Sequence, residues 1–270
     1  MTLAHLCGKI ALQISSVSIA TPNPETLDGI LSDEERLHRC YRLRHAYFVQ
    51  ERAWVGENEV APGVECDRYD PHALHLGVWQ GDEVAAYLRM VPFDGALGFM
   101  LDDELSALVS PEERAAMPRE NAVEISRLVC RMGKSGEDGQ GSSRLEDPRL
   151  VELLFKQLYR VSLERGFTRF YIVVEAGWLR LFARRFGVPF RPIGRPYRFP
   201  DGTRTVAATA TLEELEAGMR CHDEAKYGWY REVNDVGLNG EEVDSGNAGE
   251  SGREPDFSNS ESQSERSRGS

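Results

Sequence analysis

The sequence from Ala122 to Cys130 reads AVEISRLVC. It has the apolar character of a buried strand, yet Glu124, Ser126 and Arg127 place a carboxylate, a hydroxyl and a guanidinium within four positions. Charged groups inside an apolar strand are costly unless they are paired or bind a ligand. This strand therefore predicts either an ion pair that holds the sheet together or a functional site.

A second group of charges stands about sixty residues earlier, where residues 65–70 read ECDRYD. The carboxylates of Glu65, Asp67 and Asp70 precede an apolar strand, and Arg89 lies in the strand that follows it. Two interpretations stay open. The charges either form a structural network that connects strands, or they form a site for a small, positively charged amine.

The segment before this group predicts a helix from Ser32, an N-cap residue with Glu35 three positions later, to about Gln50. Arg44 and Phe48 share one face of that helix, and Trp54 follows it. Taken alone, the pattern favours the two aromatic rings in the core and a solvated Arg44.

The whole pattern predicts one mixed α/β domain. A hairpin is expected around Gln80-Gly81-Asp82, because two apolar runs flank that short turn. The expected strands are 10–19, 73–79, 84–91, 122–130, 170–174, 190–193 and 205–211. The expected helices are 32–50, 99–109, a short one from 111, then 150–165, 176–186 and 212–219.

Length, composition and charge limit the classes of protein to which the chain can belong. The chain has 270 residues and a formal charge of −12, of which −7 falls in residues 221–270. We therefore expect one folded domain to span 1–220 and an acidic, Ser- and Gly-rich tail, largely disordered, to span 221–270. The mild acidity of the first part argues against nucleic-acid binding.

Other classes are excluded by missing patterns. The five cysteines are scattered without a CxxC pair, and the six histidines include no HExxH, so no metal site is expected. No apolar run is long enough for a membrane span, and we expect a cytoplasmic protein. Gly133-Lys134-Ser135 is no P-loop, because Leu128 stands where the motif needs glycine. Ser126 lies in a strand interior, which is unlike a nucleophile on a sharp turn.

Taken together and in order, the charged and aromatic residues resemble the acyl-homoserine-lactone synthase family, the autoinducer synthases of bacterial quorum sensing. The resemblance covers about residues 36–210. It rests on the Arg-Phe-Trp spacing, the E-x-D-x-x-D set, the Arg–Pro end of a strand, a Met-Leu pair and the E-x-S-R strand. In this chain these are Arg44, Phe48, Trp54, Glu65, Asp67, Asp70, Arg89–Pro92, Met100-Leu101 and Glu124–Arg127.

The resemblance implies a single-domain, acetyltransferase-like (GNAT-like) α/β fold. Its mixed, mostly antiparallel sheet is flanked by helices, and a splayed strand pair, 124–130 and 170–174, forms the acyl-donor cleft. It also implies the reaction. An acyl group passes from acyl carrier protein, or from acyl-coenzyme A, to the amine of S-adenosylmethionine, and lactone closure then releases methylthioadenosine. S-adenosylmethionine and an acyl-phosphopantetheine donor are substrates, and no tightly bound cofactor is expected.

The resemblance implies roles for the residues as well. Glu65 or Glu124 would accept the amine proton, with Ser126 and Arg127 in the same catalytic set, and Arg89 and Arg127 would hold the carboxylates. Phe48 and Trp54, with Arg44, would surround the adenosyl group, and Asp67 and Asp70 would face its positive charge. For an acidic carrier protein we expect a basic docking face: Lys156, Arg160, Arg180 and Arg184.

Two departures from the family pattern bear on which acyl chain the protein would prefer. Phe93 follows Pro92 where the family has threonine, and Leu105 stands where it has phenylalanine. Acyl length, donor type and oligomeric state stay open. The alternatives are an N-acyl amino-acid synthase with the same fold and a non-catalytic ligand-binding relative.

Overall fold

The computed structural model describes residues 14–19, 33–131, 148–199 and 202–232. The strands are β1 (Ile14–Ile19), β2 (Leu74–Gln80), β3 (Glu83–Pro92), β4 (Ala122–Cys130), β5 (Arg169–Glu175), β6 (Arg191–Arg198) and β7 (Arg204–Thr211). The α-helices are α1 (Asp33–Arg44), α2 (Pro111–Ala115), α3 (Pro148–Arg165), α4 (Ala176–Leu181), α5 (Leu212–His222) and α6 (Glu224–Arg231). Short 3-10 or π-helical turns are η2 (His45–Glu51), η3 (Glu57–Glu59), η4 (Asp70–His72), η5 (Met100–Asp102), η6 (Ser106–Leu108) and η7 (Phe182–Phe186). Among the described helices, none is long and apolar enough to cross a bilayer.

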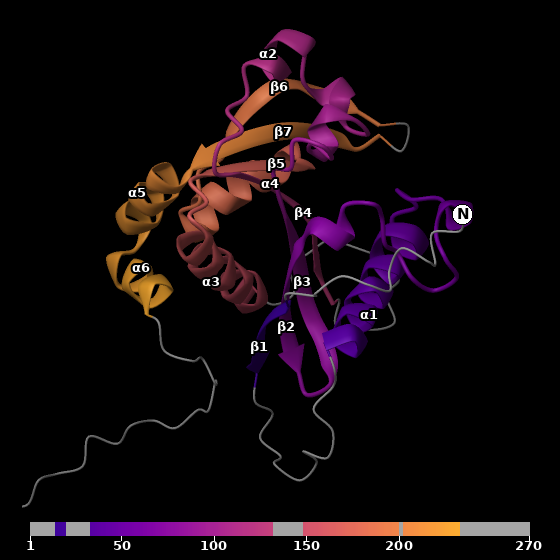
Figure 1. The fold of residues 1–270 in the computed structure, drawn as a ribbon. Coiled ribbons are helices and arrows are strands. Elements are labelled where there is room, and N and C mark those ends of the chain that lie inside the picture. The colour runs from indigo at the N-terminus through magenta and orange to yellow at the C-terminus, as the bar shows by residue number, and fades with distance from the viewer. Residues whose placement is uncertain (1–13, 20–32, 132–147, 200–201, 233–270) are drawn as a thin grey trace, which may run out of the picture. The chain divides into compact units, whose positions relative to one another are not determined.

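The described strands form a single sheet with the order β1-β2-β3-β4-β5-β7-β6. The pairs β1–β2 and β4–β5 are parallel, and the other four pairs are antiparallel. The expected mixed, mostly antiparallel sheet is thus confirmed. In Figure 1, β6, β7 and β5 lie on one side of β4, and β3, β2 and β1 lie on the other.

Side chains alternate between the two faces of the sheet along each strand, so both faces carry apolar groups. Helices cover both of these faces. On β3, Leu88 and Met90 join the large apolar cluster that contains the buried face of α3, while Tyr87 joins the cluster of Cys40 on α1. Figure 1 shows α1 and α3 on opposite sides of β3. The charged side chains of the E-x-S-R strand face the α1 side.

The parallel pair β4–β5 is short and then diverges. The two strands pair only from Ala122 with Arg169 to Ile125 with Ile172. Beyond that point β4 stays with β3, and β5 stays with β7 up to Glu175. The splayed pair expected for the fold is therefore present, and it opens from Ser126 onward.

A β-bulge accompanies the divergence. Between β3 and β4, Arg89 pairs with Ser126 but Tyr87 pairs with Val129, so β4 carries one extra residue. Arg127 has a φ of 57°, in the left-handed region that non-glycine residues rarely adopt. The bulge places Ser126 and Arg127 on the same face, although successive residues of a regular strand point to opposite faces.

Two expectations about the elements are wrong. Residues 99–109 form the 3-10 turns η5 and η6 instead of one helix. The folded part does not end at residue 220, because α6 packs Tyr227 and Tyr230 into the core. The expected disorder of the later tail lies outside the described residues.

Candidate active site

Arg44 is the centre of a buried ion network on the α1 side of the sheet. Its side chain is 0% exposed, so the expectation of a solvated Arg44 is wrong. Its Nε donates to Glu65 at 2.5 Å, and Nη1 and Nη2 donate to the two carboxylate oxygens of Asp70 at 2.6 and 3.0 Å. The bidentate geometry is the strong form of an arginine–carboxylate contact.

Two arginines from the sheet complete the network. Arg89, also fully buried, donates from Nη1 to Asp67 at 2.6 Å and to Asp70 at 2.8 Å. Arg127 donates from Nη2 to Glu65 and to Asp67, both at 3.0 Å. Three guanidinium groups therefore neutralise three carboxylates, and the network connects α1, β3 and β4 with the segment 65–70.

The ion network fixes the protonation of its carboxylates. Burial alone would raise the pKa of Glu65, but Arg44 and Arg127 outweigh burial and hold that pKa below its usual range. The same balance, with Arg44 and Arg89 as partners, holds the pKa of Asp70 far below its usual range. These carboxylates stay ionised and are poor proton acceptors near neutral pH.

Glu124 differs from these carboxylates because it is not paired with an arginine. Within the described residues it makes no ion pair, and Arg127 turns to Glu65 and Asp67 instead. Its Oε2 accepts a hydrogen bond from the backbone N–H of Met100 at 2.6 Å. Burial raises the pKa of Glu124 to about 7, and the Met100 hydrogen bond and Arg89 only partly oppose this. Glu124 can therefore exchange a proton at neutral pH.

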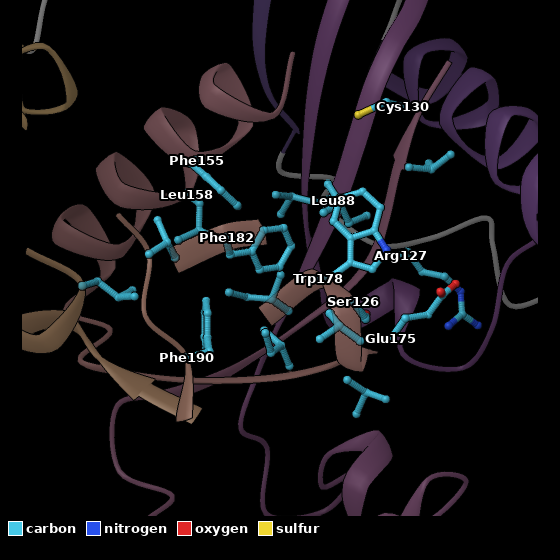
Figure 2. Close-up of a pocket in the computed structure, with 18 of the residues that line it drawn as sticks. Leu88, Ser126, Arg127, Cys130, Phe155, Leu158, Glu175, Trp178, Phe182 and Phe190 are labelled. Atoms are coloured by element: carbon cyan, nitrogen blue, oxygen red, sulfur yellow. The ribbon is translucent and has the colours of Figure 1, made fainter. Parts of the chain in front are cut away.

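Two cavities meet at the diverging strands. One, of about 740 Å³, is lined by the polar side chains of Glu65, Asp67 and Glu124 together with aromatic and apolar groups. The other, of about 180 Å³, is mainly apolar and lies between β4, β5, α3 and α5 (Figure 2). Both are bordered by the segment 125–127 and by Phe48 and Trp54.

The structure separates the predicted site residues into two groups. Phe48, Trp54, Glu65, Asp67, Glu124, Ser126 and Arg127 line a cavity. Arg44, Asp70 and Arg89 are buried beneath the cavities and line neither of them. Their charged partners are the carboxylates and arginines of the network, and Arg89 Nε also donates to the hydroxyl of Ser126 at 3.1 Å.

The expected basic docking face is only partly exposed. Lys156 is 3% exposed and lies with Nζ 4.2 Å from the ring centroid of Trp229, so it is no surface residue. The helix α6, absent from the sequence-based expectation, covers it. Arg160 is half-buried, and Arg180 and Arg184 are exposed.

One pair at the site was not predicted. Arg52, just after η2, forms an ion pair with Glu175 at the end of β5, which connects the two sides of the strand divergence. The Arg52 guanidinium also stacks on Trp54, 4.7 Å from its ring centroid. The partners are 123 residues apart, and no local pattern indicates the pairing.

Comparisons with known proteins agree with this architecture. Residues 43–133 match the acetyltransferase (GNAT) domain family. A structure of BjaI, a CoA-dependent acyl-homoserine lactone synthase with SAM and isopentyl-CoA, is 25% identical, with a TM-score of 0.53 over 72% of this chain and 83% of that chain. LasI, an AHL synthase, is 20% identical, with a TM-score of 0.54 over 70% and 89% of the two chains. TofI, in a ternary complex with an inhibitor and MTA, is 20% identical, with a TM-score of 0.53 over 74% and 97%.

The family match begins at Leu43 and covers the residues of the ion network and the E-x-S-R strand. The chain is an acyltransferase with the GNAT fold, and it resembles the acyl-homoserine lactone synthases.

Proposed function

We propose that this protein is an N-acyl-homoserine lactone synthase. It transfers an acyl group from a phosphopantetheine thioester to the amine of S-adenosylmethionine and then closes the lactone. The observation that carries the proposal is Glu124, a carboxylate with a pKa of about 7 in the polar cavity, next to the segment that both cavities share.

Glu124 is the group that takes the proton from the amine. An α-amino group has a pKa near ~8, so at neutral pH it must lose a proton before it can attack a carbonyl. A carboxylate with a pKa of about 7 accepts that proton at little cost. Glu65 is a poor base, because Arg44 and Arg127 keep its pKa low.

The space between the diverging strands β4 and β5 accommodates the acyl thioester. The free amine attacks the carbonyl carbon, the negative charge moves to the carbonyl oxygen, and the thiolate leaves when the carbonyl re-forms. In this proposal, backbone N–H groups at the bulge around Arg127 and Leu128 donate to that oxyanion. The bulge supports this role, because it interrupts the hydrogen-bond ladder. Ser126, held by Arg89, adds a hydroxyl on the same face.

The larger cavity accommodates the cationic substrate. Phe48 and Trp54 stack at a tilt, with ring centroids 6.1 Å apart, and offer aromatic faces to a sulfonium cation or a purine. Glu65 and Asp67 are the carboxylates of the network that line this cavity, and Asp67 is the more exposed of the two. In the second step a carboxylate oxygen of the bound methionine displaces methylthioadenosine from the γ-carbon.

The donor is a phosphopantetheine thioester carried by acyl carrier protein or coenzyme A. The BjaI structure with isopentyl-CoA supports coenzyme A as a carrier in a protein of this fold. The exposed Arg180 and Arg184, on α4 and η7 beside the apolar cavity, are the proposed contacts for an acidic carrier, with Arg160 as a further candidate.

A direct assay tests the proposal. The purified protein is incubated with S-adenosylmethionine and acyl thioesters, and the products are analysed by mass spectrometry. An acylated homoserine lactone together with methylthioadenosine supports the proposal. Acylated free amino acids would replace it with an N-acyl amino-acid synthase, and the absence of thioester turnover with every amine would leave a ligand-binding protein.

A further inference from the structure

Residues of the hydrophobic core form part of the wall of the apolar cavity. This part of the wall includes Tyr159, Leu215 and Met219, none of which is more than 5% exposed. The Tyr159 hydroxyl is already engaged, because it donates to Glu216 at 2.6 Å. A group that enters between the diverging strands therefore meets a packed wall of hydrocarbon.

Large aromatic side chains narrow the same cavity. The ring centroid of Phe182 lies 5.5 Å from that of Phe155 and 5.6 Å from that of Trp178. Figure 2 shows Phe182 between the α3 side chains Phe155 and Leu158 on one side and Trp178 on the other. Protein interiors are close-packed, so such rings give way only at a cost in packing.

The volume of the cavity limits what it can hold. It measures about 180 Å³. For comparison, an apolar cavity of about 150 Å³ in another protein binds one benzene molecule. We propose that the acyl group transferred is a compact hydrocarbon with at most about seven non-hydrogen atoms beyond the carbonyl, and that long linear chains are excluded. This inference rests on the proposed function and names its acyl class.

Competition between donors tests the inference. The purified full chain is given S-adenosylmethionine with coenzyme A thioesters of butanoyl, 3-methylbutanoyl, phenylacetyl, octanoyl and dodecanoyl groups, or the same groups on a carrier protein. We expect kcat/KM for the best of the first three to exceed that for dodecanoyl by at least about tenfold, the scale on which apolar pockets discriminate. Equal or better use of the dodecanoyl donor would overturn the inference.

A matched pair of variants tests whether the cavity wall sets the limit. Phe182 lines the cavity, whereas Phe186, one helical turn later, packs in the same core cluster without lining it. We expect Phe182→Leu to raise the dodecanoyl-to-butanoyl ratio of kcat/KM about tenfold. Phe186→Leu should leave that ratio unchanged even if it lowers the melting temperature. An equal shift in both variants would show that the ratio reports general loosening of the core and would overturn the assignment.

Trp178→Leu gives a second test if Phe182→Leu does not fold, since Trp178 is only half-buried. It should move the ratio in the same direction, and an unchanged ratio in a folded Trp178→Leu protein would count against the inference. Failure of the inference is distinguishable from failure of the proposed function. Methylthioadenosine release with dodecanoyl alone refutes only the size limit, whereas no release with any donor refutes the synthase.

Discussion

Glu124 lies beside a backbone N–H instead of an arginine, and this determines how its substitution should affect stability. Its pKa rises from 4.5 to about 7 on folding, so the folded state favours the protonated form. The stability that this carboxyl contributes is complete below about pH 4.5 and is lost as the pH rises through about 7. Such a shift corresponds to roughly 3 kcal/mol.

We therefore expect Glu124→Gln to be at least as stable as the parent protein above pH 7, and the advantage to vanish near pH 5. Glutamine keeps an acceptor for the Met100 N–H without carrying a charge. Thermal unfolding of both proteins between pH 5 and 8 measures the difference. A large loss of stability at pH 8 would mean that the Glu124 carboxylate has a stabilising cationic partner.

The same variant should lose turnover on the order of 10²-fold or more, because glutamine cannot accept the amine proton. Part of the loss should return at higher pH, where more of the amine is already neutral. Steady-state rates between pH 6 and 9, with binding of S-adenosylmethionine measured by calorimetry, separate catalysis from binding. Near-normal turnover at pH 7 would remove Glu124 as the base.

Asp70 and Asp67 form a matched pair for the ion network. Asp70 bridges two fully buried arginines, and Asp67 is partly exposed. Asp70→Asn should cost roughly 3–5 kcal/mol in the free energy of unfolding, because it leaves buried guanidinium charge uncompensated. Asp67→Asn should cost less. Urea unfolding of the two variants makes the comparison, and equal costs would contradict the buried role given to Asp70.

At the scale of elements, the ion pair of Arg52 and Glu175 is the contact that joins η2 to the end of β5 across the divergence. Its partners are partly exposed, so its effect on stability should be about 0.2–1 kcal/mol. Its effect on function should be larger, since Arg52 also stacks on Trp54 above the cavities.

We expect Glu175→Gln to raise KM for S-adenosylmethionine several-fold while kcat changes little, because Trp54 loses part of its support. The charge swap Arg52→Glu with Glu175→Arg should recover part of the loss that each single reversal causes. A double-mutant cycle on KM and on urea unfolding measures both effects. Additive losses in the cycle would show that the pair does not act as a unit.

At the scale of the molecule, the exposed Arg180 and Arg184 offer positive charge to an acidic carrier. Arg180→Glu and Arg184→Glu should slow the use of acyl carrier protein, with an effect that weakens as salt rises, and should affect acyl-coenzyme A less. Arg42→Glu is the control, since Arg42 is exposed on α1 and the charge change is the same. An equal effect of all three reversals would indicate net charge and not docking.

The sequence predicts most of the sheet correctly, because strand patterns such as 84–91 and 122–130 are local. It cannot show that Arg44 is buried, since that depends on carboxylates 21 and 26 residues away. For the same reason the sequence does not show that Lys156 is buried, since the residue that covers its side chain, Trp229 on α6, is far away in the chain. The roles of Glu65 and Glu124 stay open in the sequence, and only the contacts of each carboxyl distinguish them.

The extra residue in β4 has a consequence for the alternation of the whole strand. Before it, Val123 and Ile125 face the α3 side, and after it Leu128 and Cys130 do, so the apolar positions change from odd to even. The bulge thus shifts the alternation of side chains along β4 by one residue. If one residue were deleted there, one of two things would follow. Either Arg127 would stay in the strand with its side chain directed into the apolar core, or the apolar positions would keep their face and Arg127 would be the residue lost. Length between Ile125 and Leu128 is therefore as constrained as the identity of any side chain in the site.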